Sequence, residues 1–368
     1  MKSYSEFKEY VKENVLDYMP AKFENTQISI HQVVKNNDVV LDGLMIHNPD
    51  SNISPNIYLN PLYEQYQNGK DLDEIVSRVA DIYIENMEPT IDRPFEIQVN
   101  NLKTYERIKD YIFPRVSNLE QNSKRLENVP YTKQEDLAIT YHIQVANDSE
   151  GIGSVMITDY LMGEYGVDVD ELHTQAMNNM ERLSPTMIVS LKEMMADMMV
   201  RDIMNDEGLS EEEAKEYAMD MVPEDAPELY CVTNESKING AANMFNENVQ
   251  KMVADKLGGD YFILPSSVHE VLVLSKHEDM EPEELQNMVR SVNASCLSAE
   301  EVLSNQVYQY DAKEHKLSIC GPERERKQEQ SKNMDLQPAM VVMEESKQYE
   351  TKQPEQTHEP MKHSGRGR

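Results

Sequence analysis

The sequence contains no tryptophan, only six phenylalanines and only three cysteines among 368 residues. The cysteines lie far apart and form no CxxC pair, so they provide neither a disulfide framework nor half of a zinc knuckle. No apolar run approaches the roughly 20 residues that a membrane-spanning helix needs. The first residues lead into an amphipathic pattern without the apolar core of a signal peptide. We therefore expect a soluble, cytoplasmic protein with no membrane partner.

Basic residues are scarce as well. The 35 Lys and Arg residues stand against 67 Asp and Glu residues, which gives a formal net charge of −32. In residues 321–368 nine basic residues balance nine acidic ones, so the whole excess lies in residues 1–320. Because nucleic acids and anionic lipids are held mainly by Lys and Arg, we expect no direct nucleic-acid binding by this part of the chain. Residues 321–368, rich in Gln, Glu, Lys and Pro, are predicted to be a disordered tail.

The pattern of apolar residues predicts an α+β fold made of small mixed or antiparallel sheets covered by amphipathic helices. A first helix begins with the capping-box pair Ser3 and Glu6 and is followed by strands at residues 27–35 and 39–46 and a helix at 71–86. A similar order of helix, hairpin and helix recurs twice. The middle occurrence consists of a helix at 118–127, strands at 137–145 and 154–158 and a helix at 168–183. The last occurrence consists of a helix at 246–257, strands at 261–264 and 268–274 and a helix at 282–292.

These αββα-like units indicate a division of the chain into five parts. We expect an N-terminal unit at residues 1–100, a middle α/β unit at 101–186, an acidic and methionine-rich helical insert at 187–227, a C-terminal α/β unit at 228–320 and the tail at 321–368. The repeat lies in the order of elements and not in the sequence itself, so it is compatible both with internal duplication and with an ordinary α+β arrangement.

The segment most typical of an active site is a predicted turn that contains Ser266, Ser267, His269 and Glu270. Two hydroxyls, an imidazole and a carboxylate are the groups of a nucleophile–base set. However, His269 and Glu270 are neighbours, and neighbours on a strand point to opposite faces, so Glu270 is poorly placed to orient His269. The chain also has no Gly-x-Ser-x-Gly elbow to present a serine. The alternative is a tight turn whose serines satisfy backbone groups.

No other motif indicates a metal or a cofactor. The seven histidines of residues 1–320 form no HxxxH or HExxH pair, and no glycine-rich phosphate loop is present. His142 shares a strand face with Thr140 and Gln144, which we expect to face solvent or a partner. Cys231 lies in an apolar strand and is expected to be a core residue. We therefore predict no cofactor and no metal site.

The helical insert is notable for its methionines. Residues 177–221 hold 10 of the 24 methionines, and residues 206–228 hold ten acidic residues against Lys215 alone. Met at helical spacing fills irregular cores, and we expect core packing for the residues of this helical pattern, namely Met187, Leu191, Met194, Met195, Met198 and Met199. A soft-metal ligand set and a pliable groove for a partner are the alternatives.

Five segments together resemble an uncharacterised family of gut-dwelling anaerobic bacteria, domain of unknown function 5688. They are residues 52–59, 136–139, 261–271 (YFILPSSVHEV), 293–295 and 301–304. The resemblance extends from about residue 4 to residue 320 and implies a bacterial protein. Residues 111–115, 164–180 and 229–274 are also similar to domain of unknown function 1444. Neither family implies an activity, a cofactor or a catalytic residue.

The leading function hypothesis is a non-enzymatic cytoplasmic binding or scaffold protein whose partner is another protein, since acidic, Tyr- and Met-rich surfaces suit protein contacts. The first alternative is a hydrolase that uses the turn at residues 266–270. The second is an acidic nucleic-acid mimic that inhibits a DNA-binding protein, because an acidic surface can be steered to a basic cleft. The sequence indicates no particular oligomeric state.

Overall fold

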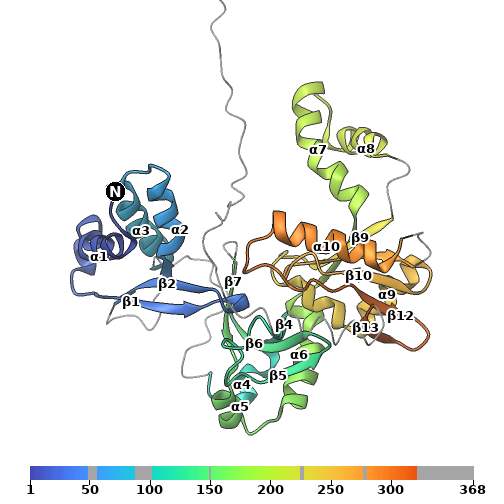
Figure 1. Cartoon of the computed structure of the whole chain (residues 1–368), viewed down its shortest axis with the longest axis horizontal. Helices are drawn as coiled ribbons and strands as arrows, with labels where there is room; N and C mark the ends of the chain where they lie inside the picture. The colour runs from blue at the N-terminus through green and yellow to red at the C-terminus, as the bar shows by residue number, and fades with distance from the viewer. Residues whose placement is uncertain (49–55, 88–101, 149–150, 224–227, 277–279, 321–368) are drawn as a thin grey trace, which may run out of the picture. The chain divides into compact units, whose positions relative to one another are not determined.

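The computed structural model describes residues 1–48, 56–87, 102–148, 151–223, 228–276 and 280–320. Over these residues the chain forms three antiparallel sheets with helices packed on them, which confirms the predicted α+β class (Figure 1). The predicted tail at residues 321–368 lies outside the described residues. No helix in the described part of the chain is long and apolar enough to cross a membrane.

The N-terminal part has the predicted order of helix, hairpin and helix. Its elements are α1 (Tyr4–Asn14), β1 (Gln27–Val34), β2 (Val40–His47), β3 (Asn56–Tyr58), α2 (Leu59–Gln67) and α3 (Leu72–Met87). The capping box forms as predicted, with Glu6 N bonded to Ser3 Oγ and Ser3 N to the Glu6 carboxylate. Phe7 and Val11 on α1 are fully buried, and they share a core with Leu44 on β2 and with Val76 and Val79 on α3.

The middle part contains a four-stranded sheet built around the long strand β6. Its elements are α4 (Tyr105–Ile108), β4 (Ile112–Asn118), β5 (Tyr131–Gln134), β6 (Leu137–Asp148), β7 (Gly151–Met156), α5 (Asp159–Tyr165) and α6 (Val169–Leu183). α6 covers the apolar face of this sheet, where Ile112, Ile139 and Ile143 pack against Leu172 and Ala176.

The helix predicted at residues 118–127 does not form, and the chain runs through successive turns there. The physical reason is local side-chain bonding. Asn118 Oδ1 accepts hydrogen bonds from the backbone N–H groups of Glu120 and Gln121, each over 3.1 Å. Side-chain bonds of this kind compete with the helical hydrogen-bond ladder. Asn128, with φ of 61°, then closes the segment in the left-handed region.

The prediction that His142 faces solvent or a partner is wrong. Thr140, His142 and Gln144 do share one face of β6, but that face is buried, and the His142 side chain is 2% exposed. His142 Nε2 lies 3.1 Å from Thr140 Oγ1, and its ring contacts that of Phe113. The second face of this sheet is therefore an interior polar surface, which the alternation of residues alone does not distinguish from an exposed one.

The C-terminal part is organised by a six-stranded sheet in the order β13-β12-β10-β11-β9-β8. The elements in chain order are β8 (Thr186–Ser190), α7 (Leu191–Glu207), α8 (Glu211–Met221), β9 (Leu229–Asn234), a short 3-10 helix η6 (Gly240–Phe245), α9 (Glu247–Leu257), β10 (Tyr261–Leu264), β11 (Val271–Ser275), α10 (Pro282–Cys296), β12 (Tyr308–Asp311) and β13 (Lys316–Ile319). α9 packs on the face that carries Ile263 and Val273, and α10 packs on the opposite face, against Phe262 and Leu274.

Residues 187–190, predicted as part of the helical insert, form a strand of this sheet instead. Cys231 is buried in β9, as predicted.

The turn between β1 and β2 joins all three parts of the chain. The Asn37 side chain donates to the carbonyls of Ala299 and Val302 over 2.8 and 2.7 Å and accepts a hydrogen bond from Asn122 Nδ2. The carboxylate of Asp38 accepts hydrogen bonds from the backbone N–H groups of Lys124 and Arg125. These contacts connect residues far apart in the sequence, so the N-terminal hairpin is anchored by a polar network.

Candidate functional site

The segment with Ser266, Ser267, His269 and Glu270 connects β10 to β11. The strand predicted from residue 268 begins only at Val271, so all four side chains belong to the connecting turn. Ser267 N donates to the carbonyl of Glu270, and His269 N donates to Ser267 Oγ over 3.0 Å. The turn is thus closed by its own backbone and by the hydroxyl of Ser267.

Both serines bond to Glu270 and neither bonds to the imidazole. Ser267 Oγ lies 3.1 Å and Ser266 Oγ lies 3.4 Å from Glu270 Oε1. His269 Nδ1 accepts a hydrogen bond from the backbone N–H of Asn239 over 3.1 Å, which leaves the proton of the neutral ring on Nε2. His269 Nε2 points towards Glu301 Oε1 at 4.0 Å. The serine–histidine hydrogen bond that activates a nucleophile is not among these contacts.

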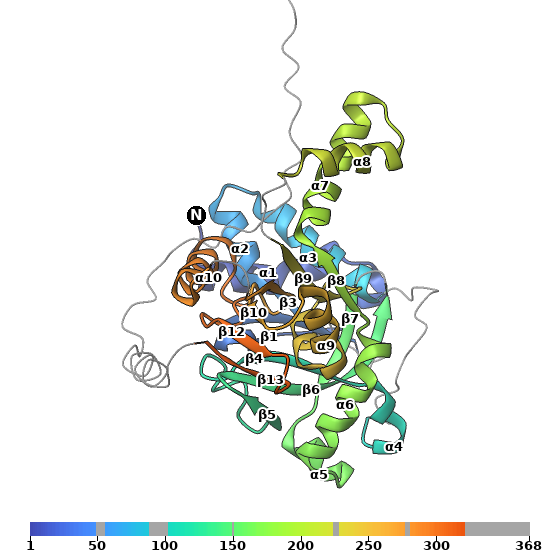
Figure 2. The ribbon, with the colours of Figure 1, turned by 90° about the vertical axis from the view of Figure 1, so that its right-hand side faces the viewer.

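A second candidate is the helical hairpin of α7 and α8, which continues directly from β8 (Figures 1 and 2). Capping boxes start both helices, at Ser190 with Glu193 and at Ser210 with Glu213. Gly208, with φ of 68°, ends α7 in the left-handed conformation that glycine adopts without strain. The hairpin has a small core of its own, formed by Ala196, Val200, Ile203, Ala214, Ala218 and Val222.

Met199 packs against this core as predicted, but the prediction of core packing is wrong for Met194, Met195 and Met198, which are exposed. Met198 is 80% exposed, and six other large side chains are also exposed: Met194, Met195, Met204, Tyr217, Met219 and Met221. The reason is that α7 and α8 meet through their small and β-branched residues. Outside the hairpin, α7 packs mainly on β8 and β9, which leaves the rest of its circumference to solvent. Residues 191–222 also carry ten acidic residues against three basic ones.

Comparisons with known proteins place this architecture in a family. The match to a family of unknown function, DUF5688, runs from residue 4 to residue 312. The chain belongs to DUF5688. A search of curated proteins and a search of solved structures each found no match. The family segment includes both the turn at residues 266–270 and the α7–α8 hairpin. The description of DUF5688 gives no activity, so the geometry of these residues is the evidence for their roles in this family member.

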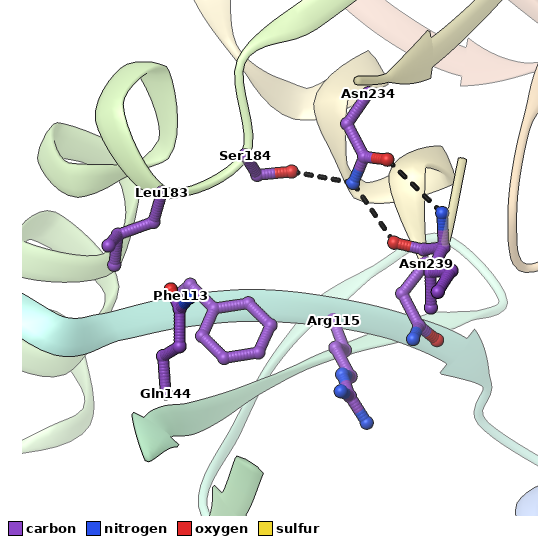
Figure 3. Close-up of a pocket in the computed structure, with 8 residues that line it drawn as sticks. Phe113, Arg115, Gln144, Leu183, Ser184, Asn234 and Asn239 are labelled. Carbon is purple, nitrogen blue, oxygen red and sulfur yellow. Dashed lines mark hydrogen bonds between the residues drawn. The ribbon is translucent and has the colours of Figure 1, made fainter. Parts of the chain in front are cut away.

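The histidines of this DUF5688 member are dispersed among structural contacts. His173 Nδ1 lies 3.2 Å from Tyr141 Oη, and His315 Nδ1 lies 3.1 Å from Tyr310 Oη. His277 lies outside the described residues. Within the part of the chain that the structure describes, no three His, Cys, Asp or Glu side chains are grouped as metal ligands. Sequence reasoning missed Arg115 and Asn239, which line a small hollow between β4 and the segments at residues 183–184 and 234–239 (Figure 3). The signal that could have found Arg115 is an arginine placed between apolar residues of a strand in a strongly acidic chain.

Proposed function

We propose that this protein is a non-enzymatic, cytoplasmic binding protein that docks onto a partner protein through its α7–α8 hairpin. The observation that carries the proposal is the exposure of Met198 and of six further Met and Tyr side chains on a hairpin that has a core of its own. Exposed apolar patches rimmed by polar residues mark interaction surfaces, methionine adapts well to a partner, and both methionine and tyrosine are enriched at interfaces.

The charge of the hairpin specifies the chemistry of the partner. Residues 191–222 contain ten acidic residues as well as the exposed apolar side chains, so a complementary partner offers an apolar cleft with basic residues beside it. A second copy of the chain is disfavoured as the occupant, because each copy carries a formal charge of −32. The nucleic-acid-mimic alternative is the special case in which that basic cleft normally holds DNA.

The remaining observations are compatible with a reducing, cytoplasmic location. Cys231, Cys296 and Cys320 are all free thiols. Secreted proteins generally pair such cysteines, whereas cytosolic proteins keep them reduced. The turn at residues 266–270 supports the hypothesis of a non-enzymatic protein, since its serines are bonded to Glu270 and not to His269.

The test is a quantitative binding experiment on a partner captured from extract of the source cells with the full chain. The double variant Met198→Gln/Tyr217→Ser removes two exposed apolar groups of the hairpin. We expect it to bind at least about tenfold more weakly, as is usual when a central apolar contact is lost. The matched control is Met252→Gln, because Met252 on α9 is 57% exposed but lies outside the hairpin. Equal losses in both variants, or none in either, would contradict the proposal. Displacement of the partner by DNA would favour the mimic alternative.

A further inference from the structure

Met198, in the middle of α7, exposes its sulfur to an unusual degree. Apart from the N-terminal Met1, it is the most exposed methionine of the described residues. Leucine would give α7 the same apolar surface with a similar helix propensity and volume, so the folding of the helix does not require a thioether here. What methionine has and leucine lacks is a sulfur atom that is open to oxidation to the sulfoxide.

Other sulfur atoms of the chain are shielded from an oxidant. Met180 and Met244 are buried, with 1% and 3% of their surface exposed. Cys231 is buried in β9, and burial raises the pKa of its thiol to about 11, so the reactive thiolate is scarce at neutral pH. Cys296 is exposed and therefore competes with Met198 for an oxidant.

The charge of the hairpin selects the class of oxidant. Asp197 and Asp202 lie one and four residues from Met198 on the same helix, and residues 191–222 carry ten acidic residues against three basic ones. This surface repels anionic oxidants and leaves neutral ones unaffected. Hydrogen peroxide and alkyl hydroperoxides are neutral two-electron oxidants that convert a thioether to a sulfoxide.

The reaction with a hydroperoxide needs no further reactant. A lone pair of Met198 Sδ attacks the terminal peroxide oxygen, so that an S–O bond forms and the O–O bond breaks. The proton of the attacked hydroxyl passes to the departing oxygen, which leaves as water or as an alcohol. The sulfur loses two electrons and the peroxide gains them.

We propose that Met198 is a site of reversible oxidation by neutral hydroperoxides, and that the sulfoxide weakens docking of the partner protein to the α7–α8 hairpin. The second part of this proposal rests on the proposed function. Oxidation turns a flexible apolar side chain into a polar one and disrupts methionine-rich interfaces. Met198 lies outside the hairpin core that contains Ala196 and Val200, so its sulfoxide leaves the fold intact.

The first experiment treats the full chain, carrying Cys296→Ser, with hydrogen peroxide and follows each methionine by peptide mass spectrometry. Because susceptibility follows exposure, Met198 should react about twice as fast as Met288, which is 47% exposed on α10. The Tm should not change while Met180 and Met244 stay unmodified. Methionine sulfoxide reductases for both epimers should restore Met198. Equal rates at Met198 and Met288, a Tm that falls in step with oxidation of Met198, or a sulfoxide that the reductases cannot reach would overturn the site.

Periodate, an anionic oxidant, tests the assignment to neutral oxidants. The ratio of the rates at Met198 and Met288 should be smaller with periodate than with hydrogen peroxide, because residues 191–222 repel the anion. Added sodium chloride should raise the periodate ratio, since salt screens this repulsion. A periodate ratio that equals the peroxide ratio and does not respond to salt would contradict this assignment.

The second experiment measures the affinity for the partner captured by the untreated chain, before and after peroxide treatment of the same variant. Treatment should weaken binding about tenfold in the Cys296→Ser chain and in its Met252→Leu variant, but less than about twofold in Met198→Leu, which keeps an apolar side chain without sulfur. No loss in a chain whose Met198 is fully oxidised, or the same loss in Met198→Leu, would overturn the effect on docking. If untreated Met198→Gln/Tyr217→Ser binds as tightly as the wild type, the proposed function fails, while the mass spectra still decide whether Met198 is the oxidation site.

Discussion

Ser267 Oγ donates a hydrogen bond to Glu270 Oε1 over 3.1 Å and accepts one from the backbone N–H of His269 over 3.0 Å. The Ser267 hydroxyl therefore orients the Glu270 carboxylate and also fixes the backbone of His269, the residue before Glu270. The cluster that most resembles an active site in the sequence thus has the contacts of a structural turn between β10 and β11. This relationship can be tested through stability.

Replacement of Ser267 by alanine should lower the free energy of unfolding by about 1–2 kcal/mol, because the 2% exposed side chain loses two hydrogen bonds. Ser266→Ala should cost less, since its one bond to Glu270 is long, at 3.4 Å. Urea unfolding of the two variants measures the difference. Equal costs for the two serines would be inconsistent with this description of the turn.

The buried imidazole of His142 should make stability depend on pH. Burial, with the charges of Arg115 and Arg125 nearby, holds the pKa of His142 well below its ordinary value of 6.5. Below pH 6.5 this histidine becomes protonated in the unfolded chain, whereas in the folded chain it stays neutral. Above pH 6.5 this residue therefore does not lower the free energy of unfolding. As the pH falls below 6.5, the free energy of unfolding decreases by about 1.4 kcal/mol per pH unit.

His142→Gln should remove this dependence, so the difference in unfolding free energy between variant and wild type should shift in favour of the variant from pH 7 to pH 5. Thr140→Val serves as the control, because it removes the hydroxyl that lies 3.1 Å from His142 Nε2 but keeps the imidazole and hence the slope. Parallel profiles of His142→Gln and the wild type would contradict the assignment.

Asn37 should be the residue on which the attachment of the N-terminal hairpin depends most. Asn37→Gly loses three side-chain hydrogen bonds but keeps the backbone conformation, whose φ is 57°. It should lower the free energy of unfolding by about 2–3 kcal/mol. Asn37→Ala should cost about 1 kcal/mol more, since alanine is strained in the left-handed region. Thermal or urea unfolding gives the order of the two variants. An alanine variant as stable as the glycine variant would disagree with this backbone geometry.

The elements that could be predicted from the sequence are those with a strong local pattern. The capping box of α1, the strand β10 and the helices α3, α6, α9 and α10 all follow from periodicity and end signals. The strand β8 could not be predicted, because its Met187 precedes a methionine-rich helix and its strand character comes from pairing with β9. The helix expected near Asn118 fails for a similar reason, since side-chain bonds to the backbone decide the conformation there.

Whether a candidate site could be predicted also depends on whether its contacts are local in the sequence. The residues at 266–270 are close in the sequence and were easy to single out, but their roles depend on partners that are distant, such as Asn239 and Glu301. The hollow of Arg115 combines strands and loops from residue 113 to residue 239, so only the fold brings it together. The acidity of the hairpin could be predicted from the sequence, whereas the exposure of Met198 depends on which face of α7 packs on α8.

The most direct test of the proposed function is site-specific photo-crosslinking in the source cells, with the photoreactive residue at position 198, 217 or 252 of the full chain. The account predicts that positions 198 and 217 capture the same protein, that position 252 does not, and that the purified partner dissociates as salt is raised, because acidic and basic surfaces are screened. Capture of the same proteins from all three positions, or a complex that is indifferent to salt, would contradict docking through the α7–α8 hairpin.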